Sequence, residues 1–305
     1  MNENGVEVLL EALPYLRRHK GATFVIKAGG EIARDREALG HLARDLALIF
    51  HVGIRAVMVH GGGPQATELS KRLGHEPQIV GGRRITDDAT LEVAKMVFAG
   101  QINTDLLGAF RREGLRPVGV SGVDAGLIHA VRRPTTAMRD PKTGRVRQVD
   151  FGHVGDITSV DTRLLVKLME EGYLPVLASL GSDGDGNIFN INADTVAARI
   201  AIDLKADKLI LLTDAPGLLE DPEDRKSLVS HLTAQRAEEM LASGAIRDGM
   251  RPKIETLIEA VRGGVPRAHI LDGKLPHSLL VELFTWDGNG TMMTSREEEK
   301  RYLDE

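Results

Sequence analysis

Short apolar runs alternate with amphipathic stretches along most of the chain. The segment "TFVIKAG" (23–29) is nearly continuous in apolar residues, which is typical of a buried strand. In "REALGHLARDLALIFHVG" (36–53), leucines recur every three or four residues, which predicts an amphipathic helix that ends near Gly53. The next strand is expected in "IRAVMVHGGG" (54–63). Strand, helix and strand at this spacing predict a parallel sheet with crossover helices.

The same alternation continues to the carboxy-terminal part of the chain. Helices are expected at 64–74, where Pro64 opens the segment, and at 193–206, 251–264 and 277–284. Strands are expected at 173–181, 208–217 and 267–273. The middle segment 126–158 instead shows β-type alternation with turn residues, and so predicts antiparallel hairpins with an exposed turn at 140–144. The whole pattern predicts one α/β fold with two lobes that meet near residues 180–190.

Both ends of the chain carry segments outside this alternation. Residues 6–19 place apolar side chains on one helical face, and Pro14 is expected to kink or divide the helix. That face needs a partner, either the chain's own core or a second subunit. The tail "SREEEKRYLDE" is highly charged and is expected to fray.

Composition narrows the class of protein. The chain has 305 residues, 42% of them hydrophobic and 27% charged, as in an ordinary globular protein with a sizeable core. It has no cysteine, which excludes disulfides and thiolate chemistry, and its net charge of −5 gives no electrostatic reason to expect nucleic acid. We find no signal-peptide pattern and no apolar stretch near the roughly 20 residues of a membrane span. A soluble, cytoplasmic protein is therefore expected.

Glycine-rich loops follow several of the predicted strands: "KAGGE", "VHGGGPQ", "GVSGVDAG" and "LLTDAPG". In open α/β sheets, ligands bind at the carboxyl ends of strands. Glycines there let backbone N–H groups approach phosphate oxygens, because no Cβ intervenes. One such loop is usually only a turn, but four on successive strands would meet at one edge. They indicate a phosphate site, although no Walker A sequence or clean G-x-G-x-x-G is present.

Three cations lie beside these loops. Lys27 ends the first strand, Arg84 follows a glycine pair in "GGRRITDD", and Lys253 lies in the first turn of a predicted helix after Pro252. An arginine suits a substrate carboxylate, and a lysine at a helix N-terminus would strengthen an anion site. Taken alone, Lys27 and Arg84 fit solvated surface residues better than ligand-binding ones, and Lys253 fits either role.

The segment "NINADTVA" (190–197) is the most unusual polar stretch. Asn190 and Asn192 alternate on an extended segment, so they are expected to share one side. Asp194 has two possible roles from sequence. It either caps the helix that follows, by accepting from its first N–H groups, or holds the lysines in place.

Taken in order, these strings resemble the amino-acid-kinase family, and within it the N-acetyl-L-glutamate kinases. The resemblance covers nearly the whole chain and rests on the series "VIKAGGE", "VMVHGGGPQ", "GGRRITDD", "GVSGVDAGLI", "DFGHVGDI", "FNINADTVA", "KLILLTDAPGLL", "GMRPKIE" and "HILDGKLPHSLLVELFTWDGNGTMM". It implies a three-layer αβα sandwich with a central, mostly parallel sheet, of the carbamate-kinase-like kind. It further implies an amino-terminal lobe (22–180) for the amino acid and dimerisation, and a carboxy-terminal lobe (181–305) for ATP and an arginine site.

The resemblance also implies an activity: phosphorylation of the γ-carboxylate of N-acetyl-L-glutamate by MgATP, with Mg²⁺ held by the ATP phosphates and not by a protein cage. It implies that Lys27 and Lys253 neutralise the transferring phosphoryl group and that Asp194 orients both. The implied substrate residues are Gly62, Gly63, Arg84, Asn190 and Asn192. The implied phosphate and ATP residues are Gly29, Gly30, Thr213, Asp214, Pro216, Gly217, Gly249 and Met250.

The N-terminal segment 1–21 resembles the extra helix of arginine-inhibited family members, which links dimers into a hexamer. The resemblance therefore implies a homo-oligomer with L-arginine as effector. The residues that match the arginine site are Lys208, His269, Glu282 and Gly290.

Two positions depart from the family pattern. Glu31 stands where an asparagine often follows the glycine pair, and Val123 replaces a lysine in "SGVDAG". Both changes make the pocket less positive. They leave open a sister kinase for another acylated amino dicarboxylate, such as a carrier-linked aminoadipate. A non-catalytic, arginine-sensing subunit is the alternative from another class, but Lys27, Asp194 and Lys253 are all present.

Overall fold

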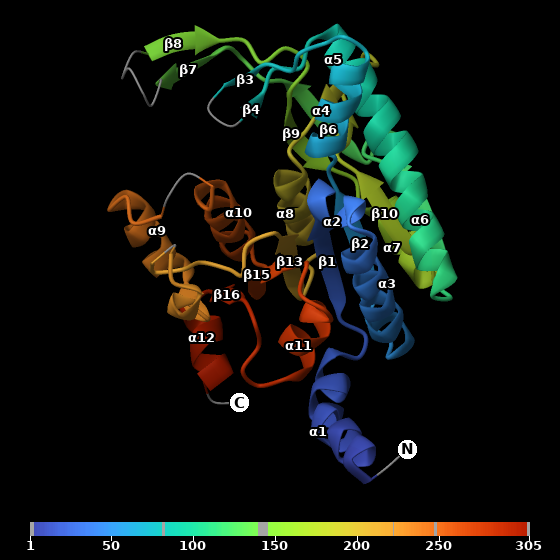
Figure 1. The fold of residues 1–305 in the computed structure, drawn as a ribbon, viewed down its shortest axis with the longest axis vertical. Helices are drawn as coiled ribbons and strands as arrows, with labels where there is room; N and C mark the ends of the chain where they lie inside the picture. Colours follow the sequence, from blue (N-terminus) through green and yellow to red (C-terminus); the bar gives the residue numbers. More distant parts are fainter. Residues whose placement is uncertain (1–2, 81–82, 140–145, 222, 247–248, 304–305) are drawn as a thin grey trace.

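A computed structural model describes residues 3–80, 83–139, 146–221, 223–246 and 249–303 (Figure 1). Its centre is an eight-stranded sheet in which only the β15–β16 pair is antiparallel. The strands in spatial order are β14 (His231–Thr233), β16 (Thr291–Thr294), β15 (Arg267–Asp272), β13 (Lys208–Thr213), β1 (Thr23–Ala28), β2 (Arg55–His60), β10 (Leu174–Ala178) and β5 (Pro117–Ser121).

Helices cover both faces of this sheet and make it the middle of three layers. On β1, Phe24 and Ile26 point into one buried core, whereas Val25 points into the other, as the alternation of side chains along a strand requires. One core is closed by α7 (Arg163–Glu170), α8 (Ala193–Asp203), α9 (Ala234–Ala242) and α10 (Arg251–Arg262). The other is closed by α3 (Arg36–His51), α4 (Gly63–Arg72), α5 (Asp88–Lys95), the π-helical segment η1 (Met96–Ile102), α6 (Asn103–Arg112) and α11 (Ser278–Phe284). The predicted α/β sandwich is confirmed.

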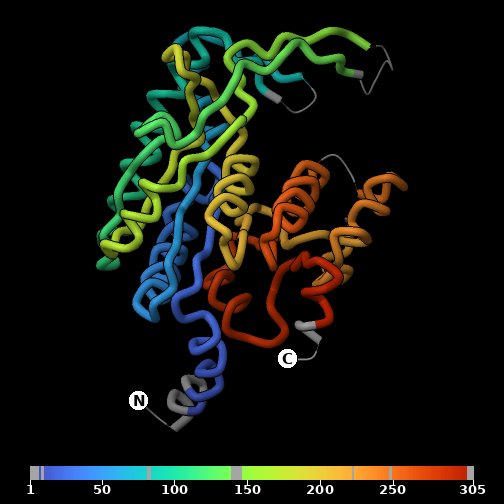
Figure 2. Tube along the Cα trace, turned by 180° about the vertical axis from the view of Figure 1, so that it is seen from behind, coloured from blue at the N-terminus to red at the C-terminus, as the bar shows by residue number. Residues whose placement is uncertain are grey.

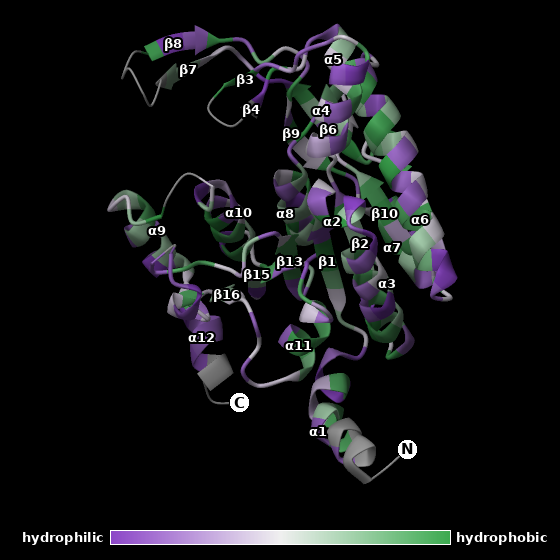
Figure 3. Ribbon diagram, viewed as in Figure 1, coloured by the Kyte–Doolittle hydropathy of each residue, from purple (hydrophilic) through white to green (hydrophobic). Residues whose placement is uncertain are grey.

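The covering helices carry hydrophobic residues on the face that packs on the sheet and hydrophilic residues on the other face. In Figure 3, α3 and α6 carry hydrophobic and hydrophilic residues in alternating bands, as helices with one buried face do. Helix α3 ends at His51, two residues before Gly53, which adopts the left-handed φ of +90° expected of a glycine stop. The predicted helices and strands of the sandwich are confirmed to within a few residues.

The middle segment forms the predicted antiparallel hairpins. Strand β6 (Ile128–Arg132) pairs with β9 (Gly155–Val160), and β7 (Thr136–Arg139) pairs with β8 (Val146–Val149). The predicted turn at 140–144 lies outside the described residues. Strands β11 (Leu180–Ser182) and β12 (Ile188–Asn190) join the β6–β9 sheet. The β7–β8 hairpin and the small β3–β4 pair (Ile79–Val80 and Arg83–Arg84) project beyond the sandwich, above α9 and α10 in both views (Figures 1 and 2).

One expectation about each chain end is corrected. Of the two outcomes expected at Pro14, division of the first helix does not occur, because α1 runs unbroken over Glu3–His19 and projects from the body (Figure 1). The charged tail does not simply fray: residues Arg296–Leu303 form α12, and Glu298 makes an ion pair of 2.9 Å with Arg267 on β15. Both side chains of that salt bridge are nearly buried, so the tail packs against the first residue of β15.

Candidate active site

Lys27 and Asp194 meet at the carboxyl edge of the central sheet. Lys27 is the last residue but one of β1, between β2 and β13, and Asp194 lies in the first turn of α8. The Lys27 Nζ atom lies 2.7 Å from Asp194 Oδ1, and both side chains are largely buried. The contact is an ion pair without hydrogen-bond alignment, so Asp194 Oδ1 has no hydrogen-bond donor. A buried charge pair of this kind costs desolvation and is weak evidence for stability, which favours a functional reason for it.

Asp194 does not cap α8; Asn192 does. The Asn192 side chain accepts from the backbone N–H groups of Asp194 at 2.8 Å and Thr195 at 3.1 Å. Capping by Asn192 leaves the Asp194 carboxylate for Lys27, so the capping role proposed for Asp194 is wrong. The two asparagines also differ in surroundings, because Asn190 donates to Thr86 Oγ1 at 3.1 Å.

Two short turns beside this pair each start a helix with a glycine. Gly29 is the N-cap of α2 (Gly30–Arg34), and Gly62 is the N-cap of α4. Gln65 joins the turns by donating from Nε2 to the Gly30 carbonyl at 2.7 Å, and a Cβ on Gly30 would lie 2.9 Å from Pro64 Cδ. Glycine is therefore favoured there by close approach. Gln65, which lies two residues after the last glycine of "HGGGPQ", was not among the expected site residues.

Lys253 lies in the first turn of α10, as predicted, but the structure does not bring it onto Asp194. Its Nζ lies 3.5 Å from the Gly249 carbonyl oxygen, and among the described contacts none joins it to Asp194. A cation in the first turn of a helix is disfavoured by the helix dipole unless an anion binds there. Helices α8 and α10 pack together in one core and both precede parallel strands of the sheet, so they both begin at its carboxyl edge.

Arg84 reaches back to the second glycine turn. Its Nη2 donates to the Gly63 carbonyl oxygen at 3.0 Å and to Thr67 Oγ1. Burial lowers the pKa of Arg84, and its Nη1 atom is buried without a hydrogen-bond partner. A buried guanidinium nitrogen with no acceptor is costly and suits an incoming carboxylate. Thr67 had no distinguishing signal in the sequence.

The end of β13 forms a turn held by its own side chains. Thr213 Oγ1 accepts from Ala215 N at 3.0 Å, while Asp214 is exposed just beyond the strand. Gly217 has φ +147°, and a Cβ there would lie 2.5 Å from Thr291 Oγ1, so only glycine fits. Pro216 lies between these residues in the turn. Met250, next to Gly249, is the N-cap residue of α10.

The two departures from the family pattern fall in different surroundings. Glu31 is exposed, and its Oε2 atom lies 2.8 Å from where a Cβ of Gly29 would be; Lys27 Nζ lies 3.9 Å from that point. The extra carboxylate therefore lies over the first glycine turn. Val123 packs partly buried against the core of α3 and α6, so it replaces a cation with apolar packing.

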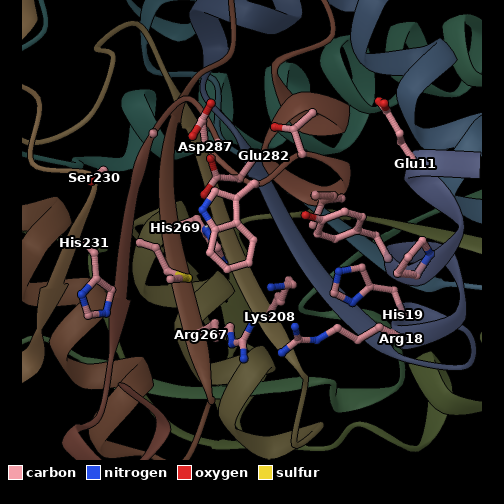
Figure 4. A pocket seen from close by; sticks show the side chains of 18 residues that line it. Glu11, Arg18, His19, Lys208, Ser230, His231, Arg267, His269, Glu282 and Asp287 are labelled. Atoms are coloured by element: carbon pink, nitrogen blue, oxygen red, sulfur yellow. Dashed lines mark hydrogen bonds and ion pairs between the residues drawn. The ribbon is translucent and has the colours of Figure 1, made fainter. Parts of the chain in front are cut away.

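The residues matched to an arginine site lie elsewhere, and they line one cavity of about 570 Å³ (Figure 4). Lys208 and Arg267 are the first residues of β13 and β15, so this cavity opens at the amino edge of the strands whose carboxyl ends carry the candidate active site. Helix α1 contributes to its wall through Arg18 and His19. The four matched residues that line it are Lys208, His269, Glu282 and Gly290.

The cavity has an acidic end and a basic end. Figure 4 shows Glu282 and Asp287 together, apart from Lys208, Arg267 and Arg18. Burial opposes ionisation of Glu282, but a hydrogen bond from His269 Nδ1 at 2.7 Å and one from the Asn289 N–H at 2.9 Å lower its pKa to about 2. Glu282 is therefore charged at neutral pH. Arg18, Arg267 and Asp287 carried no signal in the sequence that assigned them to a site.

In the part of the chain that is described, no helix is both long and apolar enough to cross a membrane. No group of three or more His, Asp or Glu side chains among the same residues is placed to hold a metal ion.

Comparison with known proteins relates this geometry to a family. Residues 22–272 match the model of the amino acid kinase family. The chain is 46% identical to an acetylglutamate kinase of Symbiobacterium thermophilum over 94% of this chain and 96% of that protein. It is 43% identical to an acetylglutamate kinase of Methanothermobacter thermautotrophicus over 95% of this chain and 99% of that protein.

Solved structures share the fold, and one of them is a longer chain. An N-acetylglutamate synthase from Neisseria gonorrhoeae, complexed with coenzyme A and N-acetyl-glutamate, superposes with a TM-score of 0.80 at 29% identity over 95% of this chain. The chain spans only 63% of that protein. Giardia carbamate kinase shares the fold with a TM-score of 0.62 at 15% identity, covering 90% of this chain and 99% of that one. Because residues 22–272 match the family model, and because the chain is 43% and 46% identical to two acetylglutamate kinases over nearly its whole length, it belongs to the amino acid kinase family and, within it, to the acetylglutamate kinases.

Proposed function

We propose that the protein transfers the γ-phosphoryl group of MgATP to the γ-carboxylate of N-acetyl-L-glutamate. The products are N-acetyl-L-glutamyl 5-phosphate and ADP, which is the second step of arginine biosynthesis. The observation that carries this proposal is the buried Lys27–Asp194 pair, which lies beside two glycine-started helices at the carboxyl edge of the sheet. A transferring phosphoryl group is strongly anionic, so positioning and charge neutralisation are what its catalysis needs.

Each catalytic residue then has a distinct task. Lys27 neutralises charge on the attacking side, Lys253 does so on the leaving-group side, and Asp194 orients Lys27 directly. Lys253 reaches the leaving oxygen by exchanging the Gly249 carbonyl for phosphate, which also places an anion at the start of α10. Asp194 Oδ1, which is ion-paired with Lys27 but accepts no hydrogen bond, can then accept from either lysine. The substrate carboxylate attacks phosphorus in line, without a phospho-enzyme.

The amino-acid substrate lies between Arg84 and the second glycine turn in this proposal. The unpartnered Arg84 Nη1 donates to the α-carboxylate of the substrate. N–H groups near Gly62 and Gly63 lie beside that carboxylate. Asn190, held by Thr86, contacts the acylated amino acid, and Asn192 supports the site by fixing the start of α8.

The nucleotide lies over the turn at the end of β13. Thr213, Asp214, Pro216 and Gly217 form one wall, and Gly249 and Met250 form the other. N–H groups at Gly29 and Gly30 approach its phosphates. In this proposal Mg²⁺ arrives as part of MgATP and stays on the phosphates. Residues 22–180 thus serve the amino acid, and residues 181–305 serve ATP.

The amino-edge cavity is proposed as a feedback site for L-arginine. Glu282 at the acidic end receives the guanidinium, and the basic end receives the carboxylate. A gonococcal N-acetylglutamate synthase has been solved with L-arginine, which supports an arginine-binding role for this fold. Helix α1, whose Leu10 side chain is largely exposed, is proposed to join dimers into a hexamer while it lines the cavity.

The exposed Glu31 favours one alternative, a kinase of the same fold that takes another acylated amino dicarboxylate. A panel of N-acetylglutamate, N-acetylaspartate and N-acetyl-aminoadipate in an ADP-release assay separates the two. The proposal expects the largest kcat/KM for N-acetylglutamate, and preference for a different member of the panel would replace it by the alternative.

A further inference from the structure

Lys208 is an unusual lysine. Its side chain lines the amino-edge cavity, yet the residue is only 6% exposed. Within the described residues it makes no hydrogen bond and no ion pair, although Glu282 lines the same cavity. Buried ammonium groups are normally paired, because desolvation of an unpaired charge is costly. An unpartnered, buried ammonium aimed into a cavity therefore indicates a missing anion.

A second unpartnered atom indicates that the ligand also carries a hydrogen-bond donor. His269 Nδ1 donates to Glu282, whereas His269 Nε2 is buried without a partner. Burial lowers the pKa of His269, so the ring is neutral and Nε2 is an acceptor. Lys208 and His269 come from adjacent strands, β13 and β15, and both line the cavity. Glu282 already accepts one bond on each oxygen and keeps further lone pairs for a ligand, whereas Lys208 has no partner among the described residues.

We infer that effector binding in this cavity is coupled to proton uptake at Lys208, which receives the effector carboxylate as an ammonium. This inference rests on the proposal that the cavity binds L-arginine. The proton comes from solvent, and no covalent bond forms. Binding therefore weakens as the solution becomes more alkaline.

The surroundings of Lys208 support this coupling. Burial, followed by the nearby Arg267 charge, lowers the pKa of Lys208 to about 7 in the free protein. The charged and titratable groups that face it come from β15, α11, α1 and α12: they are Arg267, His269, Glu282, Arg18, His19 and Glu298. A bound carboxylate adds the missing opposite charge and raises the pKa of Lys208 again.

The linkage has a definite sign. Above a pH of about 7, Lys208 is mostly neutral in the free protein and mostly charged in the liganded protein. Arginine binding is therefore accompanied by uptake of a proton from solvent. The affinity then falls by up to about tenfold per pH unit on the alkaline side.

Isothermal titration calorimetry of the full chain measures the proton directly. Arginine is titrated at pH 8.0 in phosphate, HEPES and Tris, and the slope of observed enthalpy against buffer ionisation enthalpy gives the protons exchanged. We expect about 0.9 proton taken up per arginine. The single tryptophan, Trp286, lines the cavity, so its fluorescence gives the affinity independently. That affinity should weaken about five- to tenfold between pH 7.5 and 8.5.

The matched control is Lys208→Met, which keeps length and removes the titrating group. Arginine's own α-amino titration is common to both proteins, so any difference in slope belongs to Lys208. If the variant does not fold, agmatine, which lacks the carboxylate, is the control ligand for the unaltered chain. Its binding should cause no proton uptake. Arginine binding with zero proton uptake overturns this inference alone. Absence of arginine binding at every pH overturns both the inference and the effector proposal, while kinase activity on N-acetylglutamate stands.

Discussion

The central sheet carries a buried lysine at each edge, and the two lysines differ in one respect. Lys27, at the carboxyl end of β1, meets Asp194 at 2.7 Å. Lys208, at the amino end of β13, is as deeply buried but has no partner among the described residues. A lysine that lies against a carboxylate is held in place for an anionic transition state, whereas Lys208, whose pKa is lowered to about 7, gains an opposite charge only when a ligand binds. The comparison distinguishes the edge proposed to be catalytic from the edge proposed to sense arginine, called below the catalytic edge and the sensing edge.

The strongest test of the catalytic edge is Lys253→Ala. If Lys253 neutralises the leaving group, kcat should fall about 10²- to 10⁴-fold with little change in arginine affinity. The matched control is Arg251→Ala in the same helical turn, because Arg251 makes only an exposed ion pair with Glu255 and should leave kcat within about twofold. Initial rates at saturating substrates measure both. Full activity in Lys253→Ala would contradict the proposed phosphoryl clamp.

The strongest test of the sensing edge is Glu282→Gln. The change removes the charge that receives the guanidinium, so arginine affinity measured by Trp286 fluorescence should weaken about 10- to 100-fold. Glu297→Gln on α12 is the control, since that carboxylate is exposed and does not line the cavity. Equal arginine affinities in the two variants would remove Glu282 from the site.

Lys208→Met should stabilise the folded protein in the absence of ligand. The folded-state pKa of about 7 lies below the ordinary lysine value, so the unfolded chain holds a proton that the folded chain releases between pH 7 and 10.5. The stability cost of Lys208 is therefore complete below pH 7 and fades as pH rises toward 10. We expect the variant to gain on the order of 1–3 kcal/mol at pH 6.5, and less at pH 9. Urea unfolding at the two pH values measures this, and an equal gain at both would contradict it.

The smallest expected effect concerns Glu31 at the catalytic edge. Glu31→Asn removes an exposed carboxylate above the first glycine turn, so the KM for ATP should fall about two- to fivefold. Because the group is exposed, the difference should shrink as salt rises from 0.05 to 0.5 M. A KM that is unchanged at low salt would show that Glu31 does not act on the phosphate site.

The sequence predicted the fold of the sheet better than the side-chain contacts at its two edges. Apolar periodicity and glycine stops predicted the sandwich, because burial on both sheet faces leaves a local pattern. The Lys27–Asp194 pair joins residues far apart in the chain, so the residues alone left it as one of two roles for Asp194, and resemblance to the family favoured it. Asn192 and Asp194 offered the same capping chemistry, so only the helix start in space decides which one caps. Burial of Lys208, the docking of the charged tail through Glu298 and the continuity of α1 through Pro14 depend on tertiary contacts that no local pattern records.

The central claim is that the catalytic edge phosphorylates a carboxylate and the sensing edge controls it. Trapping the acyl phosphate with hydroxylamine tests both in one assay, using N-acetyl-L-glutamate and MgATP with and without L-arginine. The account predicts ATP-dependent hydroxamate that arginine suppresses, and suppression that weakens from pH 7.5 to 8.5. Absence of hydroxamate on N-acetyl-L-glutamate would contradict the proposed activity.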